Sequence, residues 1–224
     1  MKSLLNTLKK KLQYVIQTPE ERRHSLVGPA NMWKMKRDFQ IKFLKSMNLQ
    51  PENYLLDIGC GTLRGGIPVI SYLDKGHYFG IDIRETALDE ARNELHDSGL
   101  ENRIPTLLLS KDISQLKIDQ KFNFIWAFSV LFHLNDQILN HTLDFVSKHL
   151  SDNGVFYANV SIGNSQEGQW EEFPVNSRLL SFYIDCCARY NLAVDDLGTL
   201  RQLGHVTNED SHDSQTMLKI TRSI

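Results

Sequence analysis

"LLDIGCGTLRGG", residues Leu55–Gly66, is an apolar run that contains one acid, Asp57, and opens into a glycine-rich loop. Gly59 and Gly61 allow a sharp backbone turn and let a ligand approach where a Cβ would intrude. They also expose backbone amides at the start of the next predicted helix. The stretch therefore predicts a buried strand, a ligand-binding loop and a helix.

Strand-like and helical patterns alternate after this stretch. The strand-like runs are NYLLDIG, HYFGIDI, PTLLLS, FNFIWAFS and GVFYANVSI, and the helical patterns between them are LRGGIPVISYL, RETALDEARNELHDSG and LNDQILNHTLDFVSKHLS. Near-continuous apolar strands separated by helices indicate a parallel sheet that is covered on both faces. The remaining segments are a polar stretch, GNSQEGQWEEFPVNS, then a helix, RLLSFYIDCCARYN, and two strands, LAVDDLG and TMLKITRS.

Length and charge indicate one α/β domain with a small appendage. The chain has 224 residues, of which 41% are hydrophobic, and residues 1–37 hold nine Lys or Arg and two Glu. Residues 1–30 are expected to form a basic amphipathic helical arm, and residues 31–224 the domain that contains the glycine-rich loop. The arm suits an anionic membrane surface or a protein partner. Packing on its own domain is the alternative.

No targeting or metal-binding pattern stands out. No apolar run reaches the roughly 20 residues of a membrane-spanning helix, and the first residues are not typical of a secretory signal. We therefore expect a cytoplasmic protein, or one that is peripheral at the inner membrane surface. Cys60 lies in the glycine loop, while Cys186 and Cys187 are adjacent, so we expect neither a disulfide framework nor a bound metal.

The acid beside the loop decides between two ligands. In the dinucleotide-binding pattern Arg64 would occupy the position of the third glycine, and Asp57 would lie next to a pyrophosphate. Like charges in a poorly solvated crevice repel one another, which argues against NAD. A cationic ligand suits Asp57, and the loop fits the amino-acid end of S-adenosylmethionine.

Two further acids follow the next predicted strands. Asp82 lies 21 residues after Gly61, where an acid is expected to accept hydrogen bonds from ribose hydroxyls. Asp112 is expected to accept from the adenine amine, with Ile83 and Ile113 on either side of the ring. The alternative for Asp112 is a solvated loop acid.

These residues resemble the class I S-adenosylmethionine-dependent methyltransferases. LLDIGCGT, GIDI, SKDI and FNFIWAFSVLFHL stand in the family's order, and the resemblance covers residues 55–162. It implies an α/β, Rossmann-like, mostly parallel seven-stranded sheet of order 3-2-1-4-5-7-6, with the last strand antiparallel and helices on both faces. It also implies that Asp57, Gly59, Cys60 and Gly61 hold the methionine part and that Phe128 lies near the sulfonium.

A narrower resemblance concerns the methyl acceptor. SLVGPANMWKMKRDFQIKFL, GTLRGGIPVISYLDKGHYFGIDI and DLGTLRQLGH look like segments of methyltransferases associated with bacterial polysaccharide and glycan biosynthesis. The Asn/Asp-Pro-Pro-aromatic motif of many nitrogen methyltransferases is absent, and the acidic body lacks the basic field of a nucleic-acid-binding protein. We therefore expect an O-methyltransferase acting on a sugar hydroxyl of a glycan or glycolipid precursor. The alternatives are a small-metabolite methyltransferase and a cofactor-binding protein without turnover.

A hydroxyl acceptor favours a general base, and His133 follows the fourth predicted strand. His205 is the rival candidate. In the helix before the first strand, Lys36 and Gln40 fall inside an apolar face and need partners. Gln40 and Arg37 are candidates for contact with the cofactor carboxylate. The candidates for contact with the acceptor are Trp33, Arg37, Arg64, Tyr157, Trp170 and His205.

Overall fold

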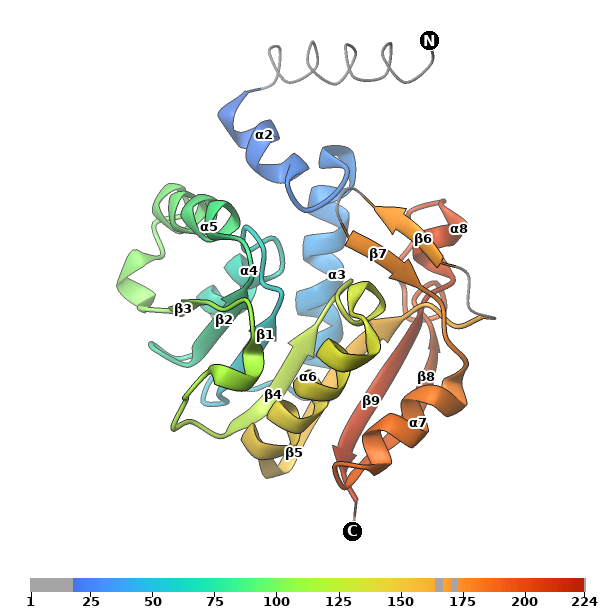
Figure 1. The fold of residues 1–224 in the computed structure, drawn as a ribbon. Coiled ribbons are helices and arrows are strands. Elements are labelled where there is room, and N and C mark those ends of the chain that lie inside the picture. Colours follow the sequence, from blue (N-terminus) through green and yellow to red (C-terminus); the bar gives the residue numbers. More distant parts are fainter. Residues whose placement is uncertain (1–17, 164–166, 171–172, 224) are drawn as a thin grey trace.

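A seven-stranded sheet forms the centre of the molecule (Figure 1). The computed structural model describes residues 18–163, 167–170 and 173–223. The strand order is β3-β2-β1-β4-β5-β9-β8, which confirms the predicted order, with β8 and β9 as the last two strands in the chain. The strands are β1 (Leu55–Ile58), β2 (Tyr78–Asp82), β3 (Thr106–Leu109), β4 (Phe122–Ala127), β5 (Leu150–Val160), β8 (Leu192–Thr199) and β9 (Thr216–Arg222).

Strand direction brings the predicted ligand-binding loops together. β1 pairs in parallel with both β2 and β4, β2 with β3, and β4 with β5. β9 runs antiparallel to β5 and β8, as predicted for the last strand. Because β1 to β5 are parallel, the loops that follow them meet at one edge of the sheet, where ligands bind in open α/β folds.

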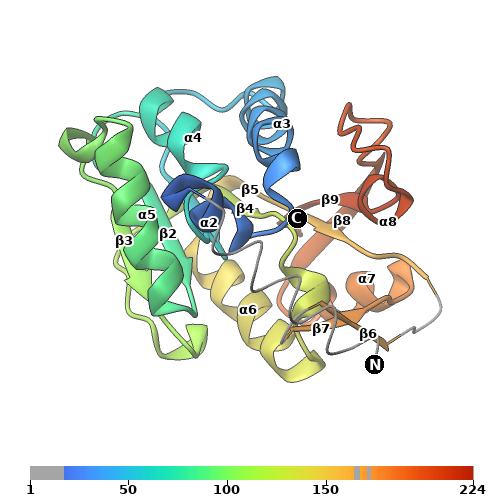
Figure 2. The same cartoon turned by 90° about the horizontal axis from the view of Figure 1, so that it is seen from above.

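Helices cover both faces of the sheet (Figure 2). One face packs against α3, α4 and α5, and the other packs against α6 and α7. These helices are α3 (Trp33–Ser46), α4 (Gly66–Tyr72), α5 (Glu85–Asp97), α6 (Asp136–His149) and α7 (Leu180–Ala188). The alternation of side chains along the strands explains the two cores: Leu56 and Ile58 belong to one, and Leu55 to the other.

Short elements complete the fold. They are α2 (Pro19–Ser25), α8 (Asp210–Asp213) and four short 3-10 helices, η1 (Ala30–Met32), η2 (Glu101–Arg103), η3 (Ile113–Gln115) and η4 (Leu131–His133). Viewed from above, α2 lies over the sheet (Figure 2). The segment that follows α2 is fixed there by two arginines, because Arg64 donates to the Val27 carbonyl (2.6 Å) and Arg84 to the Leu26 carbonyl (3.0 Å).

The described part of the predicted arm packs on the domain. Arg23 in α2 is buried and pairs with Glu90, Glu94 and Asp97 of α5, at nitrogen–oxygen distances of 3.1, 2.7 and 2.9 Å. Residues 1–17, which carry the predicted amphipathic stripe, lie outside the described residues. The segment before the expected boundary at residue 30 is therefore attached to α5 and to the loops after β1 and β2. Among the described helices, none is both long and apolar enough to cross a membrane.

The polar stretch after β5 contains a hairpin that the sequence pattern did not predict. β6 (Glu167–Trp170) pairs antiparallel with β7 (Phe173–Asn176). Its register is fixed from outside, because the Asn176 side chain donates to the carbonyls of Phe132 and Leu134, both at 3.2 Å. The hairpin therefore lies against η4, at the end of the sheet that carries the predicted ligand site.

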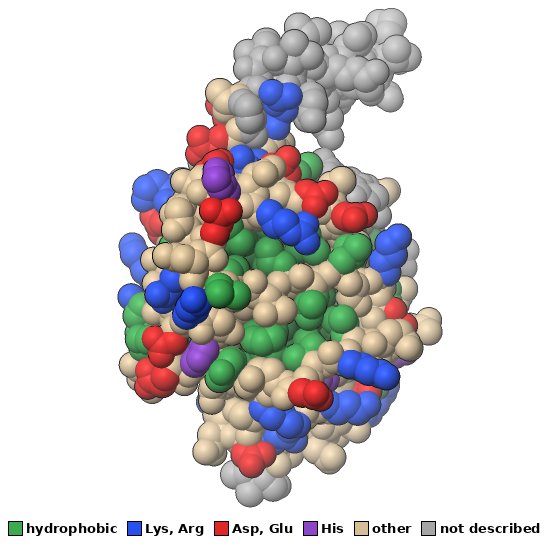
Figure 3. Space-filling model, turned by 90° about the vertical axis from the view of Figure 1, so that its left-hand side faces the viewer, with side chains coloured by type: hydrophobic (Ala, Val, Ile, Leu, Met, Phe, Trp, Pro, Cys, Tyr) green, Lys and Arg blue, Asp and Glu red, His purple; other side chains and the backbone are tan. Residues whose placement is uncertain are grey.

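The β3 edge exposes apolar side chains. Ile104, before β3, and Leu109, at its end, have 57% and 44% of their surface exposed. Figure 3 shows the side of the molecule that carries α5 and β3, where hydrophobic side chains gather in the middle with charged side chains around them. This edge is separate from the cavity described next, which neither residue lines.

Candidate cofactor and acceptor site

A cavity of about 430 Å³ lies at the carboxyl edge of the strands. Its size is in the range of small-molecule sites. Its walls come from the segment after α2, from α3, from the loops after β1, β2 and β4, from β7, and from the end of α8 and the start of β9. The residues are Val27, Gly28, Pro29, Lys36, Gln40, Asp57, Gly59, Cys60, Arg64, Gly65, Arg84, Phe128, Ser129, Phe132, His133, Val175, Ser211, His212 and Gln215.

The loop after β1 is built around two glycines with left-handed backbone. Gly59 has φ +75° and Gly61 has φ +56°. A Cβ at Gly59 would lie 2.5 Å from Cγ2 of Val130, and one at Gly61 would lie 2.6 Å from Cγ1 of Val27. Both positions therefore require glycine, which fits the predicted close approach of backbone and ligand.

Asp57 is a buried acid on the wall of the cavity. It is 6% exposed, and the Tyr78 hydroxyl donates to its Oδ2 (2.7 Å). Burial, with the nearby Asp82 carboxylate, raises the pKa of Asp57 to about 7. An opposite charge would stabilise the ionised form. A cationic ligand group in the cavity supplies that charge, so the acid fits the ammonium and sulfonium of S-adenosylmethionine.

Asp82 organises the same loop. Its Oδ2 accepts from the Gly61 amide and its Oδ1 from the Arg84 amide, both at 2.9 Å. The side chain is 5% exposed at the end of β2. Each carboxylate oxygen has a second lone pair. Asp82 can therefore hold the loop and still accept from ribose hydroxyls.

The residues assigned to the adenine follow β2 and β3. Ile83 is 49% exposed, whereas Ile113 is buried against the core. Asp112 caps η3, where its Oδ1 accepts from the Ser114 amide at 3.0 Å. None of the three lines the cavity, while Phe128, assigned to the sulfonium, does. The cavity therefore covers the amino-acid half of the predicted cofactor site, and the adenine assignment remains a prediction.

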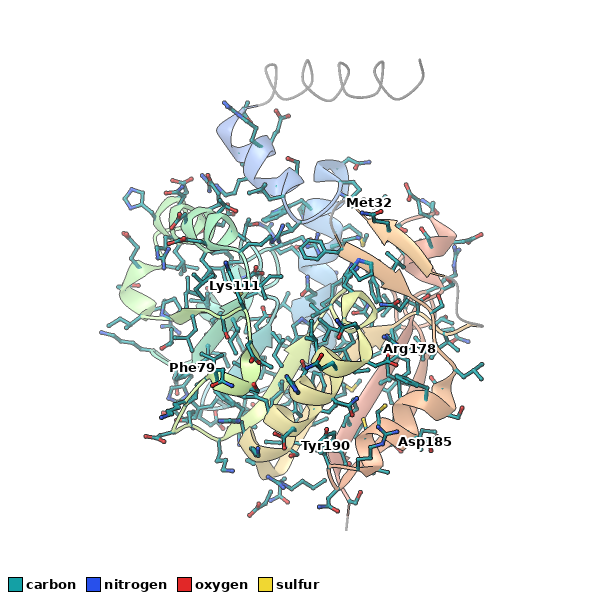
Figure 4. All side chains as sticks on the ribbon, in the orientation of Figure 1. Met32, Phe79, Lys111, Arg178, Asp185 and Tyr190 are labelled. Atoms are coloured by element: carbon teal, nitrogen blue, oxygen red, sulfur yellow. The ribbon has the colours of Figure 1, made fainter. Side chains whose placement is uncertain are left out.

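His133 lies on the wall formed by η4. Its Nδ1 is 2.7 Å from the Pro174 carbonyl of β7, and burial lowers its pKa. Arg178, labelled in Figure 4, fixes the corner after η4 by donating to the Leu134 carbonyl (2.7 Å) and pairing with Asp136 (2.8 Å). A carbonyl partner places the proton on Nδ1, so Nε2 is the basic nitrogen.

The rival histidine lies outside the cavity lining. His205 is 1% exposed, and its Nδ1 lies 3.2 Å from Oδ1 of Asp213. Its ring packs against Phe39 and Phe128, at centroid distances of 5.0 and 5.7 Å. Burial, with the nearby Lys36, lowers the pKa of His205 to about 4. His205 therefore lies in the core and does not line the cavity, whereas His133 does.

Three other acceptor candidates also fall outside the cavity lining. The Trp33 ring stacks on His24 at 3.6 Å, and Tyr157 is buried against Phe43 in the core. Nε of Arg37 lies 3.6 Å from Oδ1 of Asp38. The backbone of Trp170 belongs to β6, and its side chain is outside the described residues.

Gln40 and Arg64 do line the cavity. Gln40 accepts from the Trp126 indole (2.9 Å) and donates to the Lys36 carbonyl (3.1 Å), so its amide already serves the packing of α3 on β4. Arg64 is 8% exposed, and burial lowers its pKa to about 10. Arg64 therefore stays charged at neutral pH.

The sequence did not predict one polar pair on the opposite wall. Nζ of Lys36 lies 3.2 Å from Nδ1 of His212. Lys36 is only 3% exposed, and burial, with the nearby Arg64, lowers its pKa to about 7. The polar position inside the apolar face of α3 was the signal for Lys36. His212 lies in a short polar segment with no periodic pattern, so the sequence contains no comparable signal for it.

Residues 56–156 match the family model described as a methyltransferase domain. This region of the chain is similar to methyltransferase domains. The matched region runs from β1 to β5 and includes Asp57, Asp82 and His133. With the glycine cradle and the buried acid, the match supports an EC 2.1.1 methyltransferase that uses S-adenosylmethionine as its cofactor, in line with the resemblance to class I enzymes. Among the described residues, no group of three His, Cys, Asp or Glu is placed to hold a metal ion.

Solved methyltransferase structures share the fold. A magnesium protoporphyrin IX methyltransferase from Synechocystis with bound S-adenosylmethionine is 15% identical, with a TM-score of 0.66 over 94% of each chain. An S-adenosylmethionine-dependent methyltransferase from Clostridium acetobutylicum is 17% identical, with a TM-score of 0.64 over 86% of this chain and 92% of that one. A glycopeptide N-methyltransferase with bound S-adenosylhomocysteine is 12% identical, with a TM-score of 0.64 over 82% and 89%. These identities establish a common fold and leave the acceptor open.

Replacing Gly59 with alanine tests the cradle. Gly76 is the matched control, because it has φ +81° but a Cβ there would meet nothing within 4 Å. Gly76→Ala is expected to cost about 1–2 kcal/mol of stability from backbone strain alone. Gly59→Ala is expected to cost more and to weaken S-adenosylmethionine binding about tenfold, as measured by thermal unfolding and calorimetric titration. Equal stabilities and an unchanged affinity would show that the loop does not form the cradle.

Proposed function

We propose that the protein is an O-methyltransferase that transfers the methyl group to a hydroxyl, in a sugar of a glycan or glycolipid precursor. One observation carries the proposal: a single cavity joins the glycine loop and Asp57 to the imidazole of His133. S-adenosylmethionine, when bound, supplies a methyl group activated by a sulfonium. The protein must then hold the hydroxyl in line and take up its proton.

His133 has the state that a base at neutral pH requires. Burial lowers its pKa from an ordinary value near 6.5, so the imidazole is neutral at pH 7. The hydrogen bond from Nδ1 to Pro174 orients the ring, as an orienting partner does for other catalytic histidines. The role proposed for His133 is to accept the hydroxyl proton at Nε2 while the methyl group is transferred.

The rest of the lining suits a polar acceptor with an apolar side. Ser129, Ser211 and Gln215 offer hydrogen-bonding groups, and Phe132 and Val175 offer apolar surface. Sugars combine hydroxyl groups with apolar C–H faces. The narrower resemblance to glycan-associated enzymes points to the same acceptor class.

Transfer of labelled methyl into cell fractions tests the proposal. Extract from cells lacking this gene is incubated with the full chain and labelled S-adenosylmethionine, and is then separated into glycan and glycolipid, small-molecule, protein and nucleic-acid fractions. Label in the glycan and glycolipid fraction, stable to mild alkali as an ether is, is the expected result. Label in the small-molecule fraction would show that the methyl acceptor is a metabolite and not a sugar of a glycan or glycolipid. Label in protein or nucleic acid, or in none of the fractions, would contradict the proposal.

A further inference from the structure

We propose that Lys36, Arg64 and His212 form an anion subsite that binds a phosphate or carboxylate group of the methyl acceptor. The inference rests on the proposed function, because it concerns the acceptor of that reaction. It adds a charge requirement that neither the fold nor the methyltransferase activity implies.

The first argument is that a buried ammonium lacks an acidic partner. Lys36 is 3% exposed, and none of the ion pairs between described residues includes it. Buried charges are normally paired, because an unpaired one loses its hydration without compensation. Nζ of Lys36 contacts Nδ1 of His212, which is not an anion. Burial and the nearby Arg64 lower the pKa of Lys36 to about 7, and an anion bound in the cavity would raise this pKa again.

The nearby carboxylates are already used. Asp213 is fully buried and accepts from the Thr207 amide (2.9 Å) and hydroxyl (2.8 Å) and the Asn208 amide (3.1 Å), and it lies beside His205. Asp57 is the one carboxylate among the described residues that line the cavity, and it faces the cofactor cation. Asp213 and Glu209 raise the pKa of Lys36, but burial outweighs them, and neither forms an ion pair with it among the described residues.

Arg64 adds a second buried cation. One of its terminal nitrogens donates to the Val27 carbonyl (2.6 Å), while Nε is buried and has no hydrogen-bond partner among the described residues. Arg64 is also near enough to lower the pKa of Lys36. Two buried cations on the cavity face one acid, and S-adenosylmethionine itself brings a net positive charge. Negative charge from the second ligand would balance these cations.

The position of His212 places the subsite in the acceptor half. The predicted ribose and adenine residues follow β2 and β3, whereas His212 lies in α8, directly before β9 on the other side of β4 and β5. A chain of hydrogen bonds fixes this wall: Asn159 accepts from the Ser129 amide (2.7 Å) and donates to Gln215 (2.5 Å), and Gln215 donates to the Ser211 carbonyl (3.0 Å). The anion therefore binds over β5 and β9, beside the hydroxyl that His133 deprotonates.

Calorimetric titration of inorganic pyrophosphate into the full chain saturated with S-adenosylhomocysteine tests the subsite. Wild type is expected to bind, Lys36→Met to weaken binding tenfold or more, and Lys36→Arg to retain it within about threefold. Lys34→Met is the matched control, because Lys34 is on the same helix but exposed and paired with Asp38. Its affinity for pyrophosphate is expected to equal that of wild type.

Three results would overturn the inference. They are no binding by wild type, equal losses in Lys34→Met and Lys36→Met, and displacement of S-adenosylhomocysteine by pyrophosphate. The last would assign the subsite to the cofactor carboxylate. The titration involves no methyl transfer, so its outcome is separate from that of the fractionation. The fractionation could show a metabolite acceptor while the titration shows that pyrophosphate binding depends on Lys36. In that case the anion subsite would stand, and only the assignment of a sugar acceptor would be wrong.

Discussion

Replacing His133 with alanine is expected to lower kcat for methyl transfer by about 10²–10⁴-fold, which is the usual contribution of a positioned base. Affinity for S-adenosylmethionine is expected to change less than threefold, because His133 lies on the η4 wall and not in the glycine loop. Steady-state kinetics with the acceptor found by fractionation, together with calorimetric titration of the cofactor, measures both.

Two further variants separate catalysis from packing. His133→Asn keeps a donor near the position of Nδ1 for the Pro174 carbonyl but removes the basic Nε2, so it is expected to fold like wild type and to lose activity like His133→Ala. His77→Ala is the control, since the His77 ring makes the same kind of Nδ1 contact, to the Glu52 carbonyl (3.1 Å), outside the cavity. Full activity in His133→Asn would leave His133 with a positioning role only.

The pH profile gives an independent signature of this base. A base acts in its deprotonated form, and burial lowers the pKa of His133. The acid limb of the wild-type rate is therefore expected at a lower pH than that of an ordinary histidine, and the rate is expected to be level at neutral pH. In His133→Asn the residual rate is expected to lose this acid limb. If the acid limb of the pH profile is unchanged in His133→Asn, it reports the titration of a group other than His133.

Replacing Asp57 with asparagine is expected to weaken S-adenosylmethionine binding by about 2–5 kcal/mol, or thirtyfold and more, at pH 8. The ligand cation would lose its counter-ion, while the amide oxygen of the new side chain could still accept from the Tyr78 hydroxyl. Calorimetric titration of both proteins measures the loss. An affinity within threefold of wild type would remove Asp57 from the cofactor site.

The same substitution is expected to stabilise the protein without ligand above pH 7. The pKa of Asp57 is raised to about 7 in the folded state, from an ordinary value of 3.8. Its contribution to stability is therefore fully present below about pH 4 and is lost as the pH rises through 7, a change of a few kcal/mol at most. Asparagine has no such dependence. Thermal unfolding at pH 5 and pH 8 is expected to show the gain of Asp57→Asn over wild type at pH 8.

The elements of the fold were predictable because their signals are local. Alternating apolar runs and helical patterns define βα units, whereas the strand order came from the resemblance to class I methyltransferases and agrees with the observed sheet. Asp57, Gly59 and Gly61 were found for the same reason, because one contiguous stretch contains the strand, the acid and the turn. The hairpin of β6 and β7 was not found, because its register depends on contacts of Asn176 with η4, far away in the sequence.

The acceptor wall was less predictable because it is assembled from distant segments. Trp33 and Tyr157 looked like pocket residues, yet the structure packs one on His24 and the other in the core. A helical pattern shows which residues share a face, and it does not show what that face contacts. Lys36 acquires its chemistry from Arg64 and His212, which lie 28 and 176 residues away in the chain.

Proton release on cofactor binding tests the central claim, that this cavity holds S-adenosylmethionine against Asp57. The titration is performed at about pH 6.5 in two buffers of different ionisation enthalpy, for wild type and Asp57→Asn. Most of Asp57 carries a proton in the protein without ligand at this pH, and the bound cation is expected to displace it. The expected result is one-to-one binding in which wild type releases a large fraction of a proton more than Asp57→Asn. No binding, or equal proton release by the two proteins, would contradict the claim.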